Sequence, residues 1–183
     1  MLPLEMAAQA VSIVAMAFNI LSYQNKRQRG VILFQLFGSG LFAVSFFMLG
    51  AFVGGFLNLI GVVRAIVFMN KEKLRAYHPL WLVGFVAVYL LSYLLTFTVL
   101  GKEPTAAHLF VEFLPVVGMT ATTVSFQRKK AAAARRYGLI SSPSWLVYNV
   151  VSGSLGAILC EVFSLISILI GIWRLDIQKR KPE

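Results

Sequence analysis

The chain has 183 residues, of which 58% are hydrophobic and only 13% are charged, and its mean hydropathy is +0.79. Each bilayer crossing needs about 20 apolar residues, so this length allows roughly six or seven crossings and excludes a sizeable soluble domain. The formal charge of +10 does not indicate a nucleic-acid partner, because most basic residues lie in short clusters between apolar runs. The expected partner is the lipid bilayer, and the single Cys160 excludes an intrachain disulfide.

Seven apolar runs follow one another along the chain, and each is interpreted as a transmembrane helix. The sixth is the weakest, because Pro143 and three serines occupy its first half and predict a kink or a late start. The sequence therefore predicts an all-α integral membrane protein with seven spans. They cover residues 4–23, 31–49, 51–70, 79–100, 108–127, 138–153 and 155–173.

The basic clusters predict the orientation, because Lys and Arg accumulate in cytoplasmic loops. With seven spans, fifteen of the seventeen basic residues fall on one side of the membrane; Lys102 lies on the other and Arg64 lies within the third span. This pattern predicts an N-terminus outside and a C-terminus in the cytoplasm. The four clusters are Lys26, Arg27 and Arg29; Lys71, Lys73 and Arg75; Arg128, Lys129, Lys130, Arg135 and Arg136; and Arg174, Lys179, Arg180 and Lys181.

An internal repeat emerges when the chain is shifted by 103 residues, which places residues 22–27 on residues 125–130. Spans one to three then match spans five to seven, and span four must cross the membrane as a linker to keep both triplets in the same orientation. We expect repeats at residues 1–76 and 105–183, with the linker helix at 77–104. The same shift pairs Phe42 with Trp145, Gly50 with Gly153, and Asn58 with Glu161.

This 3+1+3 pattern resembles the SWEET, SemiSWEET and PQ-loop superfamily. The chain keeps Gln24 and Gln127 where those proteins carry Pro-Gln, although prolines are missing before both, and residues 145–148 match their Trp-x-x-Tyr motif. The spacing from that motif to a solute-lining asparagine leads to Asn58 in the first triplet and to Glu161 in the second. The resemblance implies a solute site between two triplets of helices.

A closer resemblance, over nearly the whole chain, is to bacterial inner-membrane proteins of the YgjV type. It is carried by residues 57–60 with Arg64 following, by residues 111–118, and by residues 145–161. The resemblance implies a location in the bacterial inner membrane. It transfers no activity.

Two polar residues are the strongest candidates for a site within the bilayer. Glu161 lies about six residues into the last span, roughly 9 Å deep, where a carboxylate is expensive unless it is paired, hydrated or protonated. It either hydrogen-bonds a neighbouring helix or contacts a solute or a coupling proton. Asn58 lies at the repeat-equivalent height, either at the same site or as a hydrogen-bonding link between helices.

Further polar and aromatic residues join the candidate lining of this site. Asn19 and Thr122 form another repeat pair, and Asn149 follows Tyr148. Polar residues in apolar helices normally face the bundle interior, so we expect these three to line the cavity. Trp145 either stacks on a solute or anchors the helix at the membrane interface.

Three residues are candidates for gating or ion pairing. Arg64 is expected to extend towards the inner headgroups; the alternatives are an ion pair inside the bundle or a contact to an anionic solute. Glu112 and Pro115 lie in the fifth span, where Pro115 predicts a bend. Glu112 is either interfacial or lines an outer vestibule.

The leading functional prediction is a small transporter or permease that binds a small polar solute midway through the membrane, with or without a coupling proton. The alternative is a non-transporting receptor, scaffold or lipid-binding protein with the same fold. No zinc-protease, Gly-x-Ser-x-Gly, Walker A or Rossmann motif occurs. We therefore expect no enzyme activity, no cofactor and no metal, and the sequence leaves a homo-oligomer open.

Overall fold

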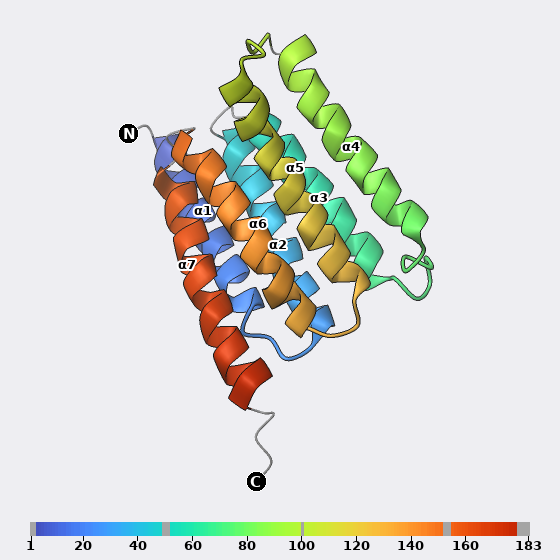
Figure 1. Cartoon of the computed structure of the whole chain (residues 1–183). Coiled ribbons are helices and arrows are strands. Elements are labelled where there is room, and N and C mark those ends of the chain that lie inside the picture. Colours follow the sequence, from blue (N-terminus) through green and yellow to red (C-terminus); the bar gives the residue numbers. More distant parts are fainter. Residues whose placement is uncertain (1–2, 49–51, 100, 152–154, 179–183) are drawn as a thin grey trace.

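The computed structural model describes residues 3–48, 52–99, 101–151 and 155–178, and within these ranges the chain consists of helices joined by short connectors (Figure 1). The prediction of an all-α chain is confirmed. Seven α-helices occur in the described residues, and a short π-helix continues the last of them. They are α1 (Pro3–Ser22), α2 (Gln28–Met48), α3 (Phe52–Met69), α4 (Pro79–Thr98), α5 (Ala106–Gln127), α6 (Ala132–Val151), α7 (Leu155–Gly171) and η1 (Ile172–Ile177).

Five helical segments in the described residues are long and apolar enough to cross a membrane: α1, α2, α4, α5 and the segment Ala157–Ile177, which joins α7 and η1. The described apolar part of α3, Gly55–Met69, is shorter. The remaining helix, α6, is less apolar because its first turns carry Arg135 and Arg136. Length and composition thus support five of the seven predicted spans.

The sixth predicted span, residues 138–153, differs from the helix observed. The helix α6 begins at Ala132, and Pro143 lies inside it without ending it. Three alanines favour helix at the start, and Arg135 is held in the fold by hydrogen bonds that the apolar pattern does not reveal. The late start predicted for this span is therefore wrong.

Six of the helices close a ring around the centre of the molecule. Helix α2 packs between α1 and α3, α6 packs between α5 and α7, and contacts of α1 with α7 and of α3 with α5 complete the ring. Helix α4 lies outside it, against α5 (Figure 1). Phe68 of α3 touches both Phe85 of α4 and Phe126 of α5, with ring centroids 5.9 and 6.0 Å apart. This aromatic cluster is one of the buried contacts that attach α4 to the ring.

The connectors α1–α2 and α5–α6 meet at one end of the bundle. Arg27 and Lys130 form an antiparallel β-bridge, and Gln28 Nε2 donates to the Ser125 carbonyl at 2.8 Å. Arg135 Nη1 donates to the carbonyls of Tyr23 and Asn25. These contacts fix the two connectors against each other although they lie about a hundred residues apart in the chain.

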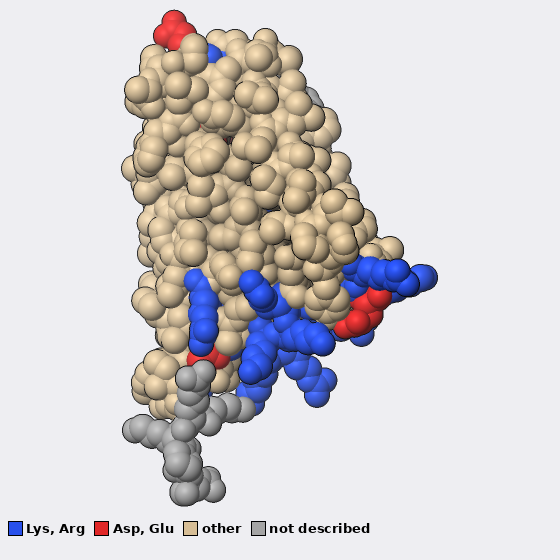
Figure 2. Space-filling view, turned by 45° about the vertical axis from the view of Figure 1, so that its right-hand side comes forward, with Lys and Arg blue, Asp and Glu red and all other residues tan. Residues whose placement is uncertain are grey.

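The charged side chains are concentrated at this end. Figure 2 shows Lys and Arg gathered where η1 ends, below sides that carry almost no charge. Lys102 lies at the opposite end, in the connector before α5. The predicted clusters therefore lie together in space as far as the structure describes them. Lys179, Arg180 and Lys181, and the repeat pair Gly50 and Gly153, lie outside the described residues.

Arg135 provides a test of how this end is stabilised. Its side chain is 2% exposed and forms a two-pronged ion pair with Asp176 of η1. Arg135→Ala leaves Asp176 and two carbonyls without their donor, so we expect a loss of about 3–5 kcal/mol in unfolding free energy. Thermal unfolding in detergent measures the change. Arg136→Ala, at the exposed neighbouring position, serves as the control, and equal effects of both changes would contradict the structural role of Arg135.

Candidate functional site

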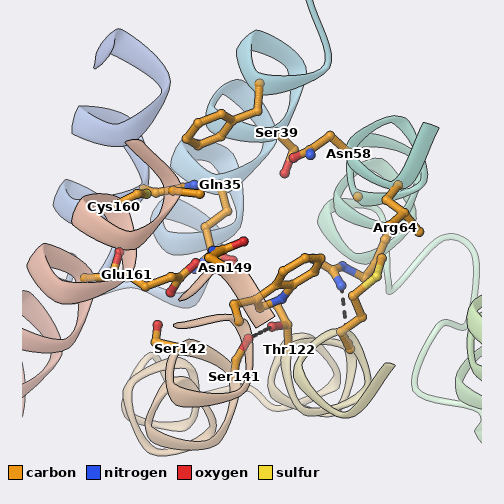
Figure 3. Close-up of a pocket in the computed structure, with 18 of the residues that line it drawn as sticks. Gln35, Ser39, Asn58, Arg64, Thr122, Ser141, Ser142, Asn149, Cys160 and Glu161 are labelled. Carbon is orange, nitrogen blue, oxygen red and sulfur yellow. Dashed lines mark hydrogen bonds between the residues drawn. The ribbon is translucent and has the colours of Figure 1, made fainter. Parts of the chain in front are cut away.

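A cavity of about 170 Å³ lies at the centre of the ring, and all six ring helices contribute side chains to it (Figure 3). Most of the polar side chains are uncharged amides and hydroxyls. The described lining contains one basic residue, Arg64 from α3, and one carboxylic acid, Glu161 from α7. The uncharged polar residues of the lining are Asn19, Tyr23, Gln35, Ser39, Asn58, Thr122, Ser141, Ser142, Asn149 and Ser164.

The six residues predicted to bind solute all line this cavity, although they come from five different helices. They are Asn19, Asn58, Thr122, Trp145, Asn149 and Glu161. The structure thus brings the predicted set together around one space. Their contact with a solute stays a prediction.

Glu161 places a carboxyl group in the cavity from the middle of α7. Ser142 of α6 lines the same cavity, and in Figure 3 the Glu161 carboxyl group points towards the Asn149 side chain. The two ion pairs within the described residues are Lys102–Glu112 and Arg135–Asp176, so neither involves Glu161. A carboxyl group with hydroxyl and amide neighbours is suited to accept a hydrogen bond or a cation from a solute, or to hold a proton.

The amide of Asn19 and the hydroxyl of Thr122 occupy the cavity wall because small residues face them. A Cβ at Gly38 would lie 2.5 Å from Asn19 Oδ1, so any larger residue at this position would require the amide to move. The Thr122 hydroxyl lies 3.1 Å from Ser141 Oγ and donates to the Gly118 carbonyl. Both side chains are thereby fixed between adjacent helices.

Trp145 lies against α5 and lines the cavity. A Cβ at Gly118 would lie 2.9 Å from both Cδ1 and Nε1 of the indole, so the close approach of α6 to α5 depends on this glycine. The ring makes an edge contact with Tyr148, with centroids 5.8 Å apart. Trp145 thus lies in the cavity wall, and its stacking on a solute stays a prediction.

The expectation that Arg64 extends to the headgroups is wrong. Its side chain is 7% exposed, and Nη1 lies 3.3 Å from both Tyr89 Oη and the Met119 carbonyl oxygen. The guanidinium carbon lies 5.2 Å from the centre of the Phe126 ring. An aromatic ring, a phenol and a carbonyl supplied by α4 and α5 therefore replace the headgroups as its partners.

Glu112 and Pro115 lie away from the cavity lining. Glu112 forms an ion pair with Lys102, next to the α4–α5 connector, and Pro115 is buried within an α5 that runs without interruption from Ala106 to Gln127. Their part in gating stays a prediction. Four further polar residues line the cavity although they were not predicted: Gln35, Ser39, Ser141 and Ser142. A glutamine inside an apolar span is the signal in the sequence that identifies α2 as part of the lining.

Comparison with known proteins identifies relatives of this chain. Residues 6–179 match the family Imp-YgjV, described as a bacterial inner membrane protein. The chain is 26% identical over 154 residues to the inner membrane protein YgjV of Escherichia coli (strain K12), an alignment that covers 84% of this chain and 76% of the relative. No solved structure matches the chain.

Labelling of introduced cysteines tests whether the cavity contains water. In a Cys160→Ala background, we expect Asn58→Cys to react with a small charged methanethiosulfonate about tenfold faster than Leu59→Cys, because the reactive thiolate forms in water and not in lipid. Leu59 is adjacent in sequence but points outwards, 45% exposed. Labelling rates in membrane vesicles measure the difference. Equal rates would place Asn58 outside any water-filled space.

Proposed function

We propose that this chain, which belongs to the Imp-YgjV family of bacterial inner membrane proteins, is a permease for a small polar solute, which binds in the central cavity. The observation that carries the proposal is the convergence of amides, hydroxyls and one carboxyl group on a closed ring of helices. A bundle with only a structural role gains nothing from polar groups around a hollow in its centre, because each must be taken out of water.

We further propose that the ring consists of two three-helix repeats, residues 1–76 and 105–183, with α4 as the linker between them. The pairing of the connectors supports this. Arg27 and Lys130, which bridge each other, are separated by the repeat length of 103 residues. Equivalent residues meet one another only where a twofold axis passes between them. That axis would run through the centre of the ring and relate α1 to α5, α2 to α6 and α3 to α7.

Equivalent hydrogen bonds within the two halves also support the repeat. Ser22 Oγ donates to the Asn19 carbonyl at 2.6 Å, and Ser125 Oγ donates to the Thr122 carbonyl at 2.7 Å. Asn19 packs on Gly38, just as Thr122 contacts Ser141, the residue equivalent to Gly38. The same local geometry thus recurs with different side chains.

Contacts between the two proposed repeats also occur at positions that are related by the offset of 103 residues. Arg64 of α3 bonds to the Met119 carbonyl of α5. At the equivalent position of α7, Ser167 donates to the Ile20 carbonyl of α1 at 2.7 Å. We call the α3–α5 contact and the α1–α7 contact the two seams. In this proposal, they are the places at which one repeat moves against the other. Rocking at the seams would expose Asn58 and Glu161 to each side of the membrane in turn.

In this mechanism Glu161 binds a donor or cationic group of the solute, or carries a coupling proton. Asn58 binds from the opposite repeat, and Asn19, Thr122 and Asn149 supply further hydrogen bonds. Trp145 supplies an apolar wall. No bond of the solute is broken, so the proposal includes no enzymatic step, cofactor or metal.

We also propose that the basic end of the bundle faces the cytoplasm, with the N-terminus outside. In a Cys160→Ala background, Glu103→Cys should react with a membrane-impermeant maleimide in intact spheroplasts, whereas Lys73→Cys should react only after permeabilisation. Both positions are exposed in connectors, at opposite ends of the molecule. Labelling followed by gel-shift analysis measures this, and the reverse pattern would contradict the orientation.

Solute flux into proteoliposomes tests transport directly. Across a panel of radiolabelled small polar solutes, we expect wild type to accelerate at least one. For that solute, Asn58→Ala and Glu161→Gln should each reduce flux by about tenfold, the effect of losing one buried hydrogen bond. Leu59→Ala and Glu103→Gln are matched controls, because they make the same kinds of change outside the cavity lining.

Two results would count against the permease. Flux that is equal with and without protein across the panel would overturn it. Solute binding to purified protein without flux, abolished by Glu161→Gln, would instead support a receptor built on the same fold.

A further inference from the structure

A second, larger hollow lies at the basic end of the bundle, with a volume of about 730 Å³. We propose that this basic cavity is a binding site for a phosphate ester, supplied either by an anionic lipid headgroup or by a soluble molecule. The site is separate from the central cavity, and it does not depend on transport.

The charge of the basic cavity is strongly unbalanced. Seven of its described lining residues are Lys or Arg and two are acids. Both acids are already engaged: Asp176 pairs with Arg135, and Glu72 accepts a hydrogen bond of 2.6 Å from the Tyr77 hydroxyl. The other cations therefore share no carboxylate partner within ion-pair distance in the described residues.

These cations converge from separate segments. Lys26, Arg27 and Arg29 come from the α1–α2 region, Lys129 and Lys130 from the α5–α6 connector, and Lys71 from the residues after α3. Orientation in the membrane requires positive charge on one side but does not require it to surround a hollow. Several Lys and Arg side chains lining one cavity can bind a phosphate group, because together they supply several charge-assisted hydrogen-bond donors.

Lys71 shows how closely the charges are placed. Its ammonium group and that of Lys129 lie over the same Tyr77 ring, 5.2 and 5.6 Å from its centre. Burial lowers the pKa of Lys71 and Lys129 lowers it further, while Glu72 acts in the opposite direction. An anion in the cavity would relieve the repulsion between these two ammonium groups.

Gln28 provides a second and independent observation. It lines the same cavity and is 6% exposed. Its Nε2 donates a hydrogen bond to the Ser125 carbonyl, but its Oε1 is buried without a hydrogen-bond partner in the described structure. Such an acceptor needs a donor. Because the Oε1 atom itself is buried, the Gln28 amide would have to turn towards the cavity to accept a hydrogen bond from a ligand hydroxyl, such as those of a phosphoglycerol group.

The experiment compares two double variants that each remove two positive charges from the same end. Arg27→Gln with Lys130→Gln changes the lining of the cavity, whereas Lys73→Gln with Arg75→Gln changes exposed residues outside it. Glycerol 1-phosphate binding to the purified protein in a neutral detergent is measured by calorimetry. Native mass spectrometry measures retention of phosphatidylglycerol against phosphatidylcholine.

We expect wild type to bind at least one of the two probes, and the first pair to weaken that binding by about tenfold or more. The second pair should leave it within about twofold. Binding of the soluble ester identifies a metabolite-type ligand, and selective retention of phosphatidylglycerol alone identifies a lipid headgroup.

Failure to bind either probe would overturn the proposal. So would equal weakening by both pairs, which would indicate attraction to the basic end in general. Thermal unfolding of each variant checks that it is folded, and Arg29→Gln replaces the first pair if that pair is not.

Discussion

The absence of water from the bilayer core is the constraint on which the rest of this structure depends. A polar side chain in hydrocarbon must find partners within the protein. The outer faces of the helices accordingly carry exposed apolar residues such as Ile13 and Leu169, while polar side chains such as Asn58 and Glu161 converge on the central cavity. The cost of placing polar groups in lipid therefore explains both the apolar outer surface and the polar side chains at the centre.

Close packing of the ring then depends on where the smallest residues lie. Gly38 gives space to the Asn19 amide and Gly118 gives space to the Trp145 indole, with hypothetical Cβ contacts of 2.5 and 2.9 Å. Both glycines lie in the ring helices at contacts within one half of the molecule. The packing of α1 on α7 and of α3 on α5 is less extensive than the packing within α1–α3 or within α5–α7. At the basic end, however, hydrogen bonds of Gln28, Lys71 and Arg135 also join the two sets of helices. In the proposed rocking of the repeats, movement would therefore concentrate at the α1–α7 and α3–α5 contacts away from the basic end.

The same physics explains which features were predictable. Asn58 and Glu161 interrupt apolar runs at matching positions, and the cost of burying them assigns them to the interior without any knowledge of the packing. Arg64 was not predictable in this way, because Tyr89 and Phe126, which accommodate it, come from helices far along the chain. The early start of α6 likewise depends on partners of Arg135 in another connector. Patterns within a span reveal its exposed face but not the partners brought to it by other spans.

Aromatic packing separates the two cavities, and this bears on how a permease of this shape would work. Arg64 lines the central cavity, Phe68 lines the basic cavity, and Phe126 contacts both of them. Phe68 and Phe126 are fully buried. A solute that left the central cavity towards the basic end would have to separate these rings from each other and the Arg64 guanidinium from Phe126. Since Phe68 belongs to one proposed repeat and Phe126 to the other, rocking of the repeats is the movement that would part them. The Arg64 guanidinium, which lies over Phe126, would then stand between the solute site and the route to the basic end. An anionic group on the solute would compete with the Phe126 ring for this guanidinium group.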